Sequence, residues 1–222
     1  MIPRRFAAAC AALMLIAAAP ARHAPAVNLA ALHAADGSEL RVKSTTFKGA
    51  KALEAAAPAG HDGLVAIPGR AFHDGSITLR IAGSPGPGAN PTARGFVGVA
   101  FRIDGAQRRY ELFYLRPTNG RADDQLRRNH SLQYVSAPDW PWERLRKETP
   151  GQYESYADLQ PDVWTTMRIE VSGTKARLYV NGAAQPALIV NDLKAGDSSG
   201  GVALWIGPGT VAHFADVRIT PR

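Results

Sequence analysis

The residues most able to do chemistry are concentrated between positions 109 and 148. This stretch begins as a strand and then loses any apolar periodicity. Its long polar and aromatic side chains cost conformational entropy to order, and a loop that only connects two strands is usually short. Arginine, asparagine and histidine hydrogen-bond to hydroxyl-rich or anionic ligands, and neighbouring tryptophans offer flat faces for stacking. We therefore predict that the stretch forms most of a binding site; the alternative is a solvated surface loop with incidental charges.

The candidate ligand-binding residues come from this stretch and from the strand before it. Residues 96–103 (FVGVAFRI) alternate between an apolar face and a face that is first small and then basic. Arg102 and Arg116 are expected to share one face if their strands are antiparallel neighbours. The loop at 83–94 either borders the site or merely connects two strands. The predicted ligand-binding set is Arg102, Tyr114, Arg116, Asn119, Arg128 and Trp140.

The same stretch contains candidate catalytic groups. Glycosidases work with two carboxyl groups held at a defined separation, and Asp123 or its neighbour could pair with Glu143 across the loop. His130 could act as a base, because histidine titrates near neutral pH. The candidate catalytic residues are therefore Asp123, Glu143 and His130. The alternative is that the acids form salt bridges with nearby arginines and that His130 is a simple hydrogen-bonding group.

The sequence predicts no cofactor and no metal centre. The histidines at 61, 73, 130 and 213 lack the spacing of zinc ligands, and no glycine-rich phosphate loop is present. A structural calcium ion is compatible with an all-β fold, but no motif locates one.

The N-terminus has the pattern of a secretory signal. Arg4 and Arg5 precede an apolar run, and small residues with an A-x-A pattern follow, so we predict a signal peptide over residues 1–26. The run is too short to span a bilayer, which predicts no membrane insertion. Cys10, the only cysteine, lies inside this segment, so the mature chain has no disulfide. Export without disulfides favours a periplasmic or secreted location.

The chain is basic, with a formal net charge of +7. A basic excess can indicate nucleic acid, but the sequence has no basic helical stripe and no nucleic-acid-reading motif. For an exported chain, an oligosaccharide or polysaccharide is the better partner. The sequence gives no indication of the oligomeric state.

The rest of the sequence consists of short alternating strands separated by turn signals. Apolar residues alternate in 77–81, 97–103, 167–171, 176–180 and 202–206, and Asn181-Gly182 is a strong hairpin signal. No amphipathic helix is expected. Residues 27–38 are an alanine-rich N-terminal arm, and the sequence leaves open whether they form a short helix or a loose segment. We predict an all-β fold from residue 39 to 222, a single domain in which two antiparallel sheets form a sandwich.

The sequence from about residue 39 to 222 resembles a known superfamily, most clearly in its C-terminal third. Its runs WTTMRIEVSGTKARLYVNG, GGVALWIG and HFADVRI are similar to the concanavalin A-like lectin/glucanase jelly roll, close to laminin-G-like domains and to the 3-keto-disaccharide hydrolase-like domain. The resemblance implies glycan binding on the concave sheet and its rim loops. Laminarinase-type members carry E-x-D-x-x-E or E-x-D-x-E on one strand, which this sequence lacks at Glu111 and elsewhere.

Three functions follow from this resemblance and from the polar stretch. The first is carbohydrate binding without catalysis, which the absence of a recognisable catalytic pair favours. The second is a glycan-cleaving enzyme, either a hydrolase or a lyase. The third is a laminin-G-like protein-interaction module, which the many polar groups of the stretch disfavour.

Overall fold

The computed structural model describes residues 24–35, 38–105 and 108–222. Nearly all of the expected signal segment, including Cys10, lies outside the described residues. Within them, no helix combines the length and the apolar character needed to cross a membrane.

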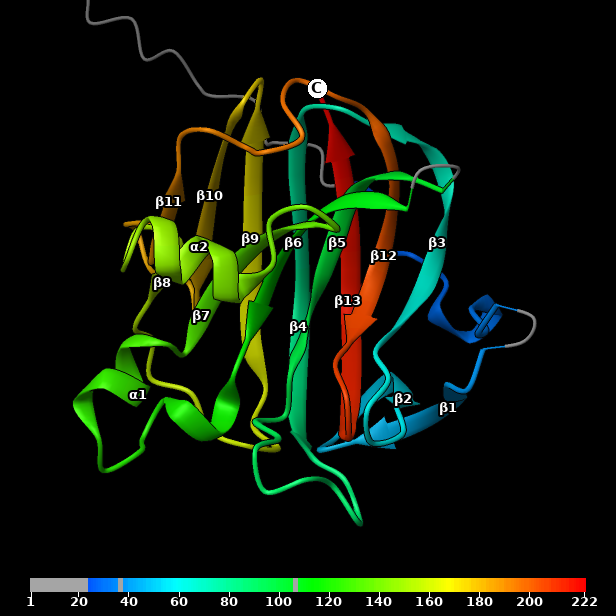
Figure 1. The fold of residues 1–222 in the computed structure, drawn as a ribbon. Helices are drawn as coiled ribbons and strands as arrows, with labels where there is room; N and C mark the ends of the chain where they lie inside the picture. The colour runs from blue at the N-terminus through cyan, green and yellow to red at the C-terminus, as the bar shows by residue number, and fades with distance from the viewer. Residues whose placement is uncertain (1–23, 36–37, 106–107) are drawn as a thin grey trace, which may run out of the picture.

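Two antiparallel sheets pack face to face and form a sandwich, as expected from the alternating strands (Figure 1). The seven-stranded sheet has the order β1 (Arg41–Phe47), β2 (Ala50–Ala56), β13 (Thr210–Pro221), β4 (Gly75–Pro85), β9 (Thr165–Ser172), β10 (Lys175–Val180), β11 (Leu188–Val190). The six-stranded sheet has the order β3 (Gly63–Phe72), β12 (Gly200–Ile206), β5 (Val97–Asp104), β6 (Arg109–Leu115), β7 (Leu132–Ala137), β8 (Glu154–Ser155).

The core lies between the sheets and is built from the inward positions of the alternating strands. Ile77, Leu79 and Ile81 of β4 are buried there, as are the corresponding residues of β9 and β10. In the facing sheet, Val99 and Leu204 are opposite each other in the register of β5 and β12 and are fully buried. Because side chains alternate across a strand, these positions could be assigned from the sequence.

The expectation that residues 116–148 form one long loop without helices is wrong. This region contains a 3₁₀ turn (Pro117–Asn119) and two short helices, α1 (Gln125–Asn129) and α2 (Trp142–Glu148). The strand β7 lies between α1 and α2. The Asp124 side chain caps α1, and the buried Leu145 anchors α2. The β7 strand pairs with β6 along its whole length. The apolar run of β7 is too short to predict a strand, and pairing with β6 adds β7 to the sheet.

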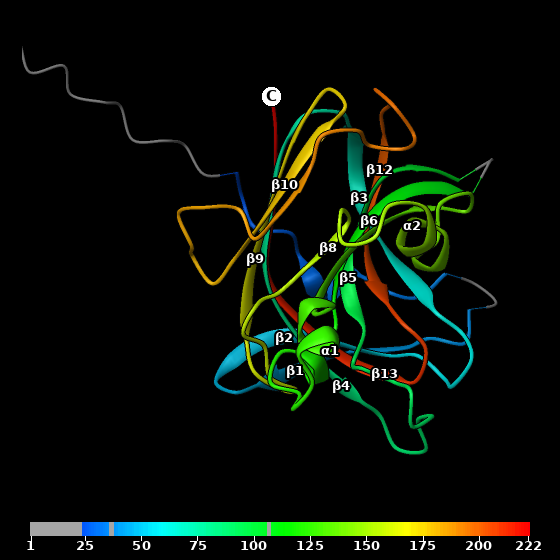
Figure 2. The same cartoon turned by 60° about the vertical axis from the view of Figure 1, so that its left-hand side comes forward.

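The outer face of the six-stranded sheet lies beneath α2 (Figures 1 and 2). Gly98 of β5 is opposite both Tyr114 and Trp205, so the two aromatic side chains meet above this glycine at a ring-centroid distance of 4.9 Å. A Cβ atom at Gly98 would lie 2.7 Å from the Cβ atom of Tyr114. The Trp205 indole Nε1–H donates to Asp62 at 2.7 Å. The outer face is therefore a second apolar layer that supports α2 and the loops beside it.

The N-terminal arm is packed against the sandwich. The Val27 N–H donates to the Val217 carbonyl at 2.8 Å, and a short 3₁₀ helix follows at Leu29–Ala31. Leu32 is buried in the core cluster. These described residues of the arm thus have a defined structure.

Candidate functional site

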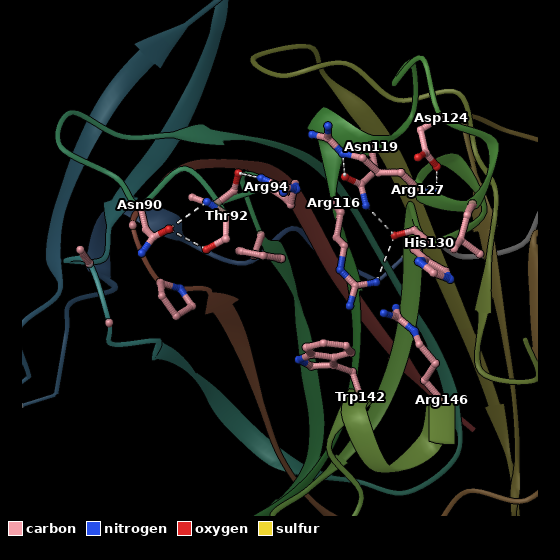
Figure 3. A pocket seen from close by; sticks show the side chains of 17 residues that line it. Asn90, Thr92, Arg94, Arg116, Asn119, Asp124, Arg127, His130, Trp142 and Arg146 are labelled. Atoms are coloured by element: carbon pink, nitrogen blue, oxygen red, sulfur yellow. Dashed lines mark hydrogen bonds between the residues drawn. The ribbon is translucent and has the colours of Figure 1, made fainter. Parts of the chain in front are cut away.

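A cavity of about 720 Å³ lies at the end of the six-stranded sheet, near α1 and the β4–β5 loop (Figure 3). Its lining comes from five parts of the chain: the β4–β5 loop, the segment after β6 with α1, α2, the loop around residue 59 and the loop around residue 208. The polar and aromatic lining residues are Asn90, Thr92, Arg94, Phe96, Arg116, Asn119, Asp124, Arg127, His130, Trp142 and Arg146. We call this cavity the arginine pocket.

Arg116 lines the arginine pocket and is only 5% exposed. Its Nη1 donates to the His130 carbonyl at 3.0 Å and to Gln133 Oε1 at 3.1 Å, and its Nη2 donates to the Tyr114 hydroxyl at 2.7 Å. All three acceptors are neutral. Its position is set by β6, which ends one residue earlier at Leu115. The guanidinium is therefore held rigidly.

Trp142 places an indole ring beside two guanidinium groups. The Cζ atoms of Arg116 and Arg146 lie 5.8 Å and 4.6 Å from its ring centroid, and the side chain remains partly exposed. Arg146 in turn donates to Glu154 at 2.6 Å, and His130 Nε2 lies 3.1 Å from the same carboxylate. Glu154 thus neutralises Arg146 and orients His130.

Arg94 and Arg127 complete the basic lining. Arg94 Nη1 donates to the carbonyls of Pro91 and Ala93 at 2.7 and 2.9 Å. Arg127 Nε donates to Asn119 Oδ1 at 3.1 Å. Asp124 is the only carboxylate that the described residues contribute to the lining. Its Oδ1 accepts from the Arg127 backbone N–H at 2.7 Å as the cap of α1.

The surroundings disfavour positive charge in the arginine pocket. Burial, and then the proximity of Arg146, lowers the pKa of Arg116 from its usual value. Burial and the nearby Arg127 lower the pKa of Arg94. Burial also lowers the pKa of His130 more than Glu154 raises it, so its imidazole is neutral at neutral pH. A negatively charged group inside the cavity would relieve this repulsion.

The expected partnership of Arg102 with Arg116 is wrong. The β5–β6 register is interrupted between Phe101 and Asp104, and Arg102 takes a positive φ of 54° there. Its guanidinium donates to Asp74 and to the carbonyls of His73, Gly173 and Gly196 at the opposite end of the strand. Arg102 therefore holds loops together and does not line the arginine pocket.

Three other residues of the expected binding set lie outside the lining. Tyr114 lies under Arg116 and supports it, and burial raises the pKa of Tyr114 to about 12. Arg128 lies over the Tyr156 ring, 5.4 Å from its centroid. The Trp140 ring is contacted by Arg144 and Lys194 at 3.7 and 4.7 Å. Of the expected set, Arg116 and Asn119 line the arginine pocket.

The expected catalytic residues are divided in the same way. His130 lines the arginine pocket, whereas Asp123 and Glu143 are exposed and lie outside its lining. The carboxylate that does line it belongs to Asp124. The sequence marked the segment but not the orientation of its side chains, because the turns of α1 and α2 decide which residues point inward.

The lining residues outside the predicted set include Arg94, Arg127, Trp142 and Arg146. Arg94 is the last residue of the 83–94 loop. The sequence left open whether this loop borders the site or merely connects two strands, and Arg94 shows that it borders the pocket. Trp142 and Arg146 are four residues apart, so one face of a helix would have brought them together. A prediction of α2 was therefore the missing signal.

His73, Asp74 and Asp197 have ligand-type atoms within 4.8 Å of one another. The Arg102 guanidinium lies 3.2 Å from Asp74 and 3.6 Å from Asp197, and His73 Nε2 lies 2.7 Å from Asp197. Because these contacts already place positive charge on the carboxylates, we assign the cluster to an ion-pair network and not to a cation site.

Two smaller cavities adjoin the arginine pocket. One, of about 570 Å³, shares His130 and Arg146 with the arginine pocket and continues to Tyr156. The other, of about 300 Å³, shares Phe96 and Trp142 and continues over Tyr114 to Trp205. The arginine pocket is thus the middle of a longer depression.

No protein-family model and no curated protein matches the sequence. Solved structures do match the fold. The carbohydrate-binding module CBM66 from Bacillus subtilis superposes with a TM-score of 0.53 at 11% identity, over 80% of this chain and 92% of the module. A Bacillus subtilis protein of unknown function with a galectin-like fold gives 0.52 at 12% identity, over 83% and 91%.

A sialidase also matches, with a TM-score of 0.51 at 8% identity over 88% of this chain, but the match covers only 19% of the sialidase. At these identities the comparisons establish the fold alone. Together with the two antiparallel sheets, they show that the chain has a two-sheet jelly-roll sandwich fold.

Proposed function

We propose that the chain is an exported carbohydrate-binding domain and that the arginine pocket is its binding site. The observation that carries the proposal is Trp142, a partly exposed indole held beside the guanidinium groups of Arg116 and Arg146. A sugar ring has an apolar face that can stack on an indole and hydroxyl groups that can accept from guanidinium donors. The volume of the cavity, about 720 Å³, is within the usual range for small-molecule sites.

Binding without cleavage is supported by the acids of the site. Glycoside hydrolysis ordinarily needs two carboxyl groups on either side of the scissile bond. Among the described residues, Asp124 supplies the one carboxyl group of the lining, and this carboxylate caps α1. The fold shared with a carbohydrate-binding module is consistent with the same role. Export rests on the signal-like pattern of residues 1–26.

The test is a panel of neutral and acidic oligosaccharides, incubated with the mature chain and scored for both retention and cleavage. We expect retention without cleavage. Trp142→Ala should weaken binding by about 2 kcal/mol or more, as expected for a tryptophan at the centre of a site. Calorimetric titration of the variant with the retained sugar measures this loss.

Trp140→Ala is the matched control, because Trp140 belongs to the same segment but lies outside the lining. It should bind as the parent chain does, provided that circular dichroism shows a folded protein. If the Trp142→Ala variant binds the sugar as well as the parent chain does, the site lies elsewhere. The same conclusion follows if only the Trp140→Ala variant loses affinity. Failure of every sugar to bind would remove the function itself.

A second candidate is a glycan-cleaving enzyme, and the contact between His130 and Glu154 favours it. A neutral imidazole held by a carboxylate at 3.1 Å is an arrangement that can accept a proton. This candidate is supported over simple binding if the parent chain cleaves a sugar of the panel and the His130→Gln variant still binds that sugar but no longer cleaves it.

A further inference from the structure

We propose that the ligand of the arginine pocket is an acidic sugar whose carboxylate is bound by Arg116, with Arg94 and Arg127 as further cationic contacts. This inference rests on the proposed function and names the class of glycan.

The first observation is the unbalanced charge of the lining. Four arginines line the cavity, against one carboxylate. Arg146 is neutralised by Glu154 at 2.6 Å. Arg94, Arg116 and Arg127 form no ion pair within the described parts of the chain. Three cations therefore face one cavity without a protein counter-charge at contact distance.

The second observation is the environment of Arg116. A buried charge is costly unless a counter-charge and hydrogen bonds compensate it. The three hydrogen bonds of Arg116 go to a carbonyl, an amide oxygen and a hydroxyl, all neutral. They hold the guanidinium in place but leave its charge intact. They also leave two of its five N–H donors without an acceptor in the described residues.

A carboxylate fits this environment better than a hydroxyl group. It can accept two parallel N–H bonds from one guanidinium and supplies the missing negative charge. A neutral sugar would fill the donors but leave the positive charge of the arginines uncompensated. Burial first, and then the neighbouring arginines, lower the pKa of Arg94 and Arg116. The acidic group is expected to lie toward Arg94 and Arg127, because Glu154 already satisfies Arg146.

The cavity is larger than a small inorganic anion requires. Its volume is about 720 Å³, and Trp142 presents an aromatic surface beside the arginines. An anion carried on a sugar ring uses both features, whereas phosphate or sulfate alone uses only the arginines. The structure thus points to a uronic-acid unit within a glycan.

The test compares oligomers that differ only in charge. The mature chain is titrated calorimetrically with oligomers of galacturonate, mannuronate and guluronate and with the methyl ester of each. At least one acidic oligomer should bind about tenfold or more tightly than its ester. Its affinity should fall as salt is raised, because salt screens the charges. Neutral oligosaccharides and sodium sulfate are titrated in parallel.

The variants Arg94→Met and Arg127→Met test the cationic contacts at positions where the fold tolerates change. Both side chains are at least partly exposed, so the domain should stay folded. Each should weaken binding of the acid severalfold and leave binding of the ester nearly unchanged. Arg116→Lys, which keeps the charge but loses the planar fork, should weaken binding of the acid further.

Arg109→Met is the control. Arg109 is exposed at the opposite end of β6 from Arg116, so its loss changes the net charge equally without touching the cavity. The Arg109→Met variant should bind the acidic oligomer as tightly as the parent does. If it loses as much affinity as the Arg94 and Arg127 variants, their loss reflects net charge and not a contact in the pocket.

The outcomes separate this inference from the proposed function. If esters or neutral sugars bind as well as the acids, the acidic preference is wrong and carbohydrate binding stands. If sulfate alone binds as tightly as the oligomers, the site recognises a small anion and the acidic-sugar inference is overturned. If neither neutral nor acidic sugars bind, both proposals fail together.

Discussion

At the scale of single residues, burial decides which polar groups are structural and which are available to a ligand. Arg102 is as buried as Arg116, but its hydrogen bonds include the Asp74 carboxylate. Arg116 has only neutral hydrogen-bond acceptors. Two arginines that look equivalent in the sequence therefore differ in what they can still bind.

Glu111 is a buried carboxyl that faces the core. It accepts from the Tyr134 hydroxyl at 2.7 Å and from the Ala195 N–H at 2.9 Å. Burial nevertheless raises its pKa, because desolvation of the charged form outweighs these hydrogen bonds. Folding therefore favours the protonated carboxyl, and ionisation of Glu111 at higher pH works against the folded state.

We predict that Glu111→Gln changes the pH dependence of stability. The pKa of Glu111 is higher in the folded chain than in the unfolded chain, where it is about 4.3. The resulting stabilisation of the folded state is complete below the unfolded-state pKa and is lost as the pH rises through the folded-state pKa. The glutamine variant lacks this loss. Its free energy of unfolding should thus improve relative to the parent as the pH rises above about 4.3. Urea unfolding of both chains across this range measures the difference, and a gap independent of pH would contradict the assignment.

At the scale of elements, two short helices shape the site. Neither α1 nor α2 has the length of a stable isolated helix, so caps and burial hold them. Asp124 caps α1, which carries Arg127, and Leu145 fixes α2, which carries Trp142 and Arg146. The position of the pocket residues thus depends on contacts made by residues beside them.

Asp124 has two separable roles, in the cap and in the charge of the lining. Asparagine caps a helix about as well as aspartate but carries no charge. If the ligand is acidic, Asp124→Asn should strengthen binding of the acidic oligomer, because it removes the only carboxylate of the lining. Asp124→Ala should instead weaken the cap by about 1 kcal/mol. Calorimetric titration of both variants tests this, and weaker acid binding by the asparagine variant would contradict it.

The turn at Asn181-Gly182 shows the reach of a local signal. Both residues have positive φ, 53° and 71°, as the sequence predicts. The strand that follows in the same sheet, β11, begins only at Leu188. The dipeptide therefore predicts the local turn but not the length of the connection between β10 and β11.

At the scale of the whole molecule, the arginine pocket lies at one end of the six-stranded sheet, and the N-terminal arm contacts β13. The pocket is built from segments between residues 59 and 209. The arm joins β13 through Val27 and sends Leu32 into the core cluster. The described arm is therefore part of the folded domain.

We predict that Leu32→Ala lowers the free energy of unfolding by about 2 kcal/mol or more, the usual range for truncating a buried leucine. His33→Ala, an exposed neighbour, should change it by no more than about 0.5 kcal/mol. Denaturant titration of both variants measures the two effects. Equal stability of the two variants would show that the arm contributes little to the fold.

The sequence by itself determined the strongly alternating strands and the faces of their side chains. Ile77, Leu79 and Ile81 point inward because alternation is a local property of extended backbone. For the same reason Tyr114 and Arg116 lie on one face, next to each other. The all-β sandwich follows from many such strands without a long amphipathic helix.

Only the tertiary structure decided which residues share the pocket. A bulge at Arg102 turned that side chain away from Arg116, and register is a long-range property that alternation does not fix. Long-range packing also formed α2, which placed Trp142 in the lining and Trp140 outside it. Arg94 and Arg127 meet at the pocket although 33 positions separate them in the chain. Such a meeting depends on the folding of the sheets, because nothing local in either segment encodes the other.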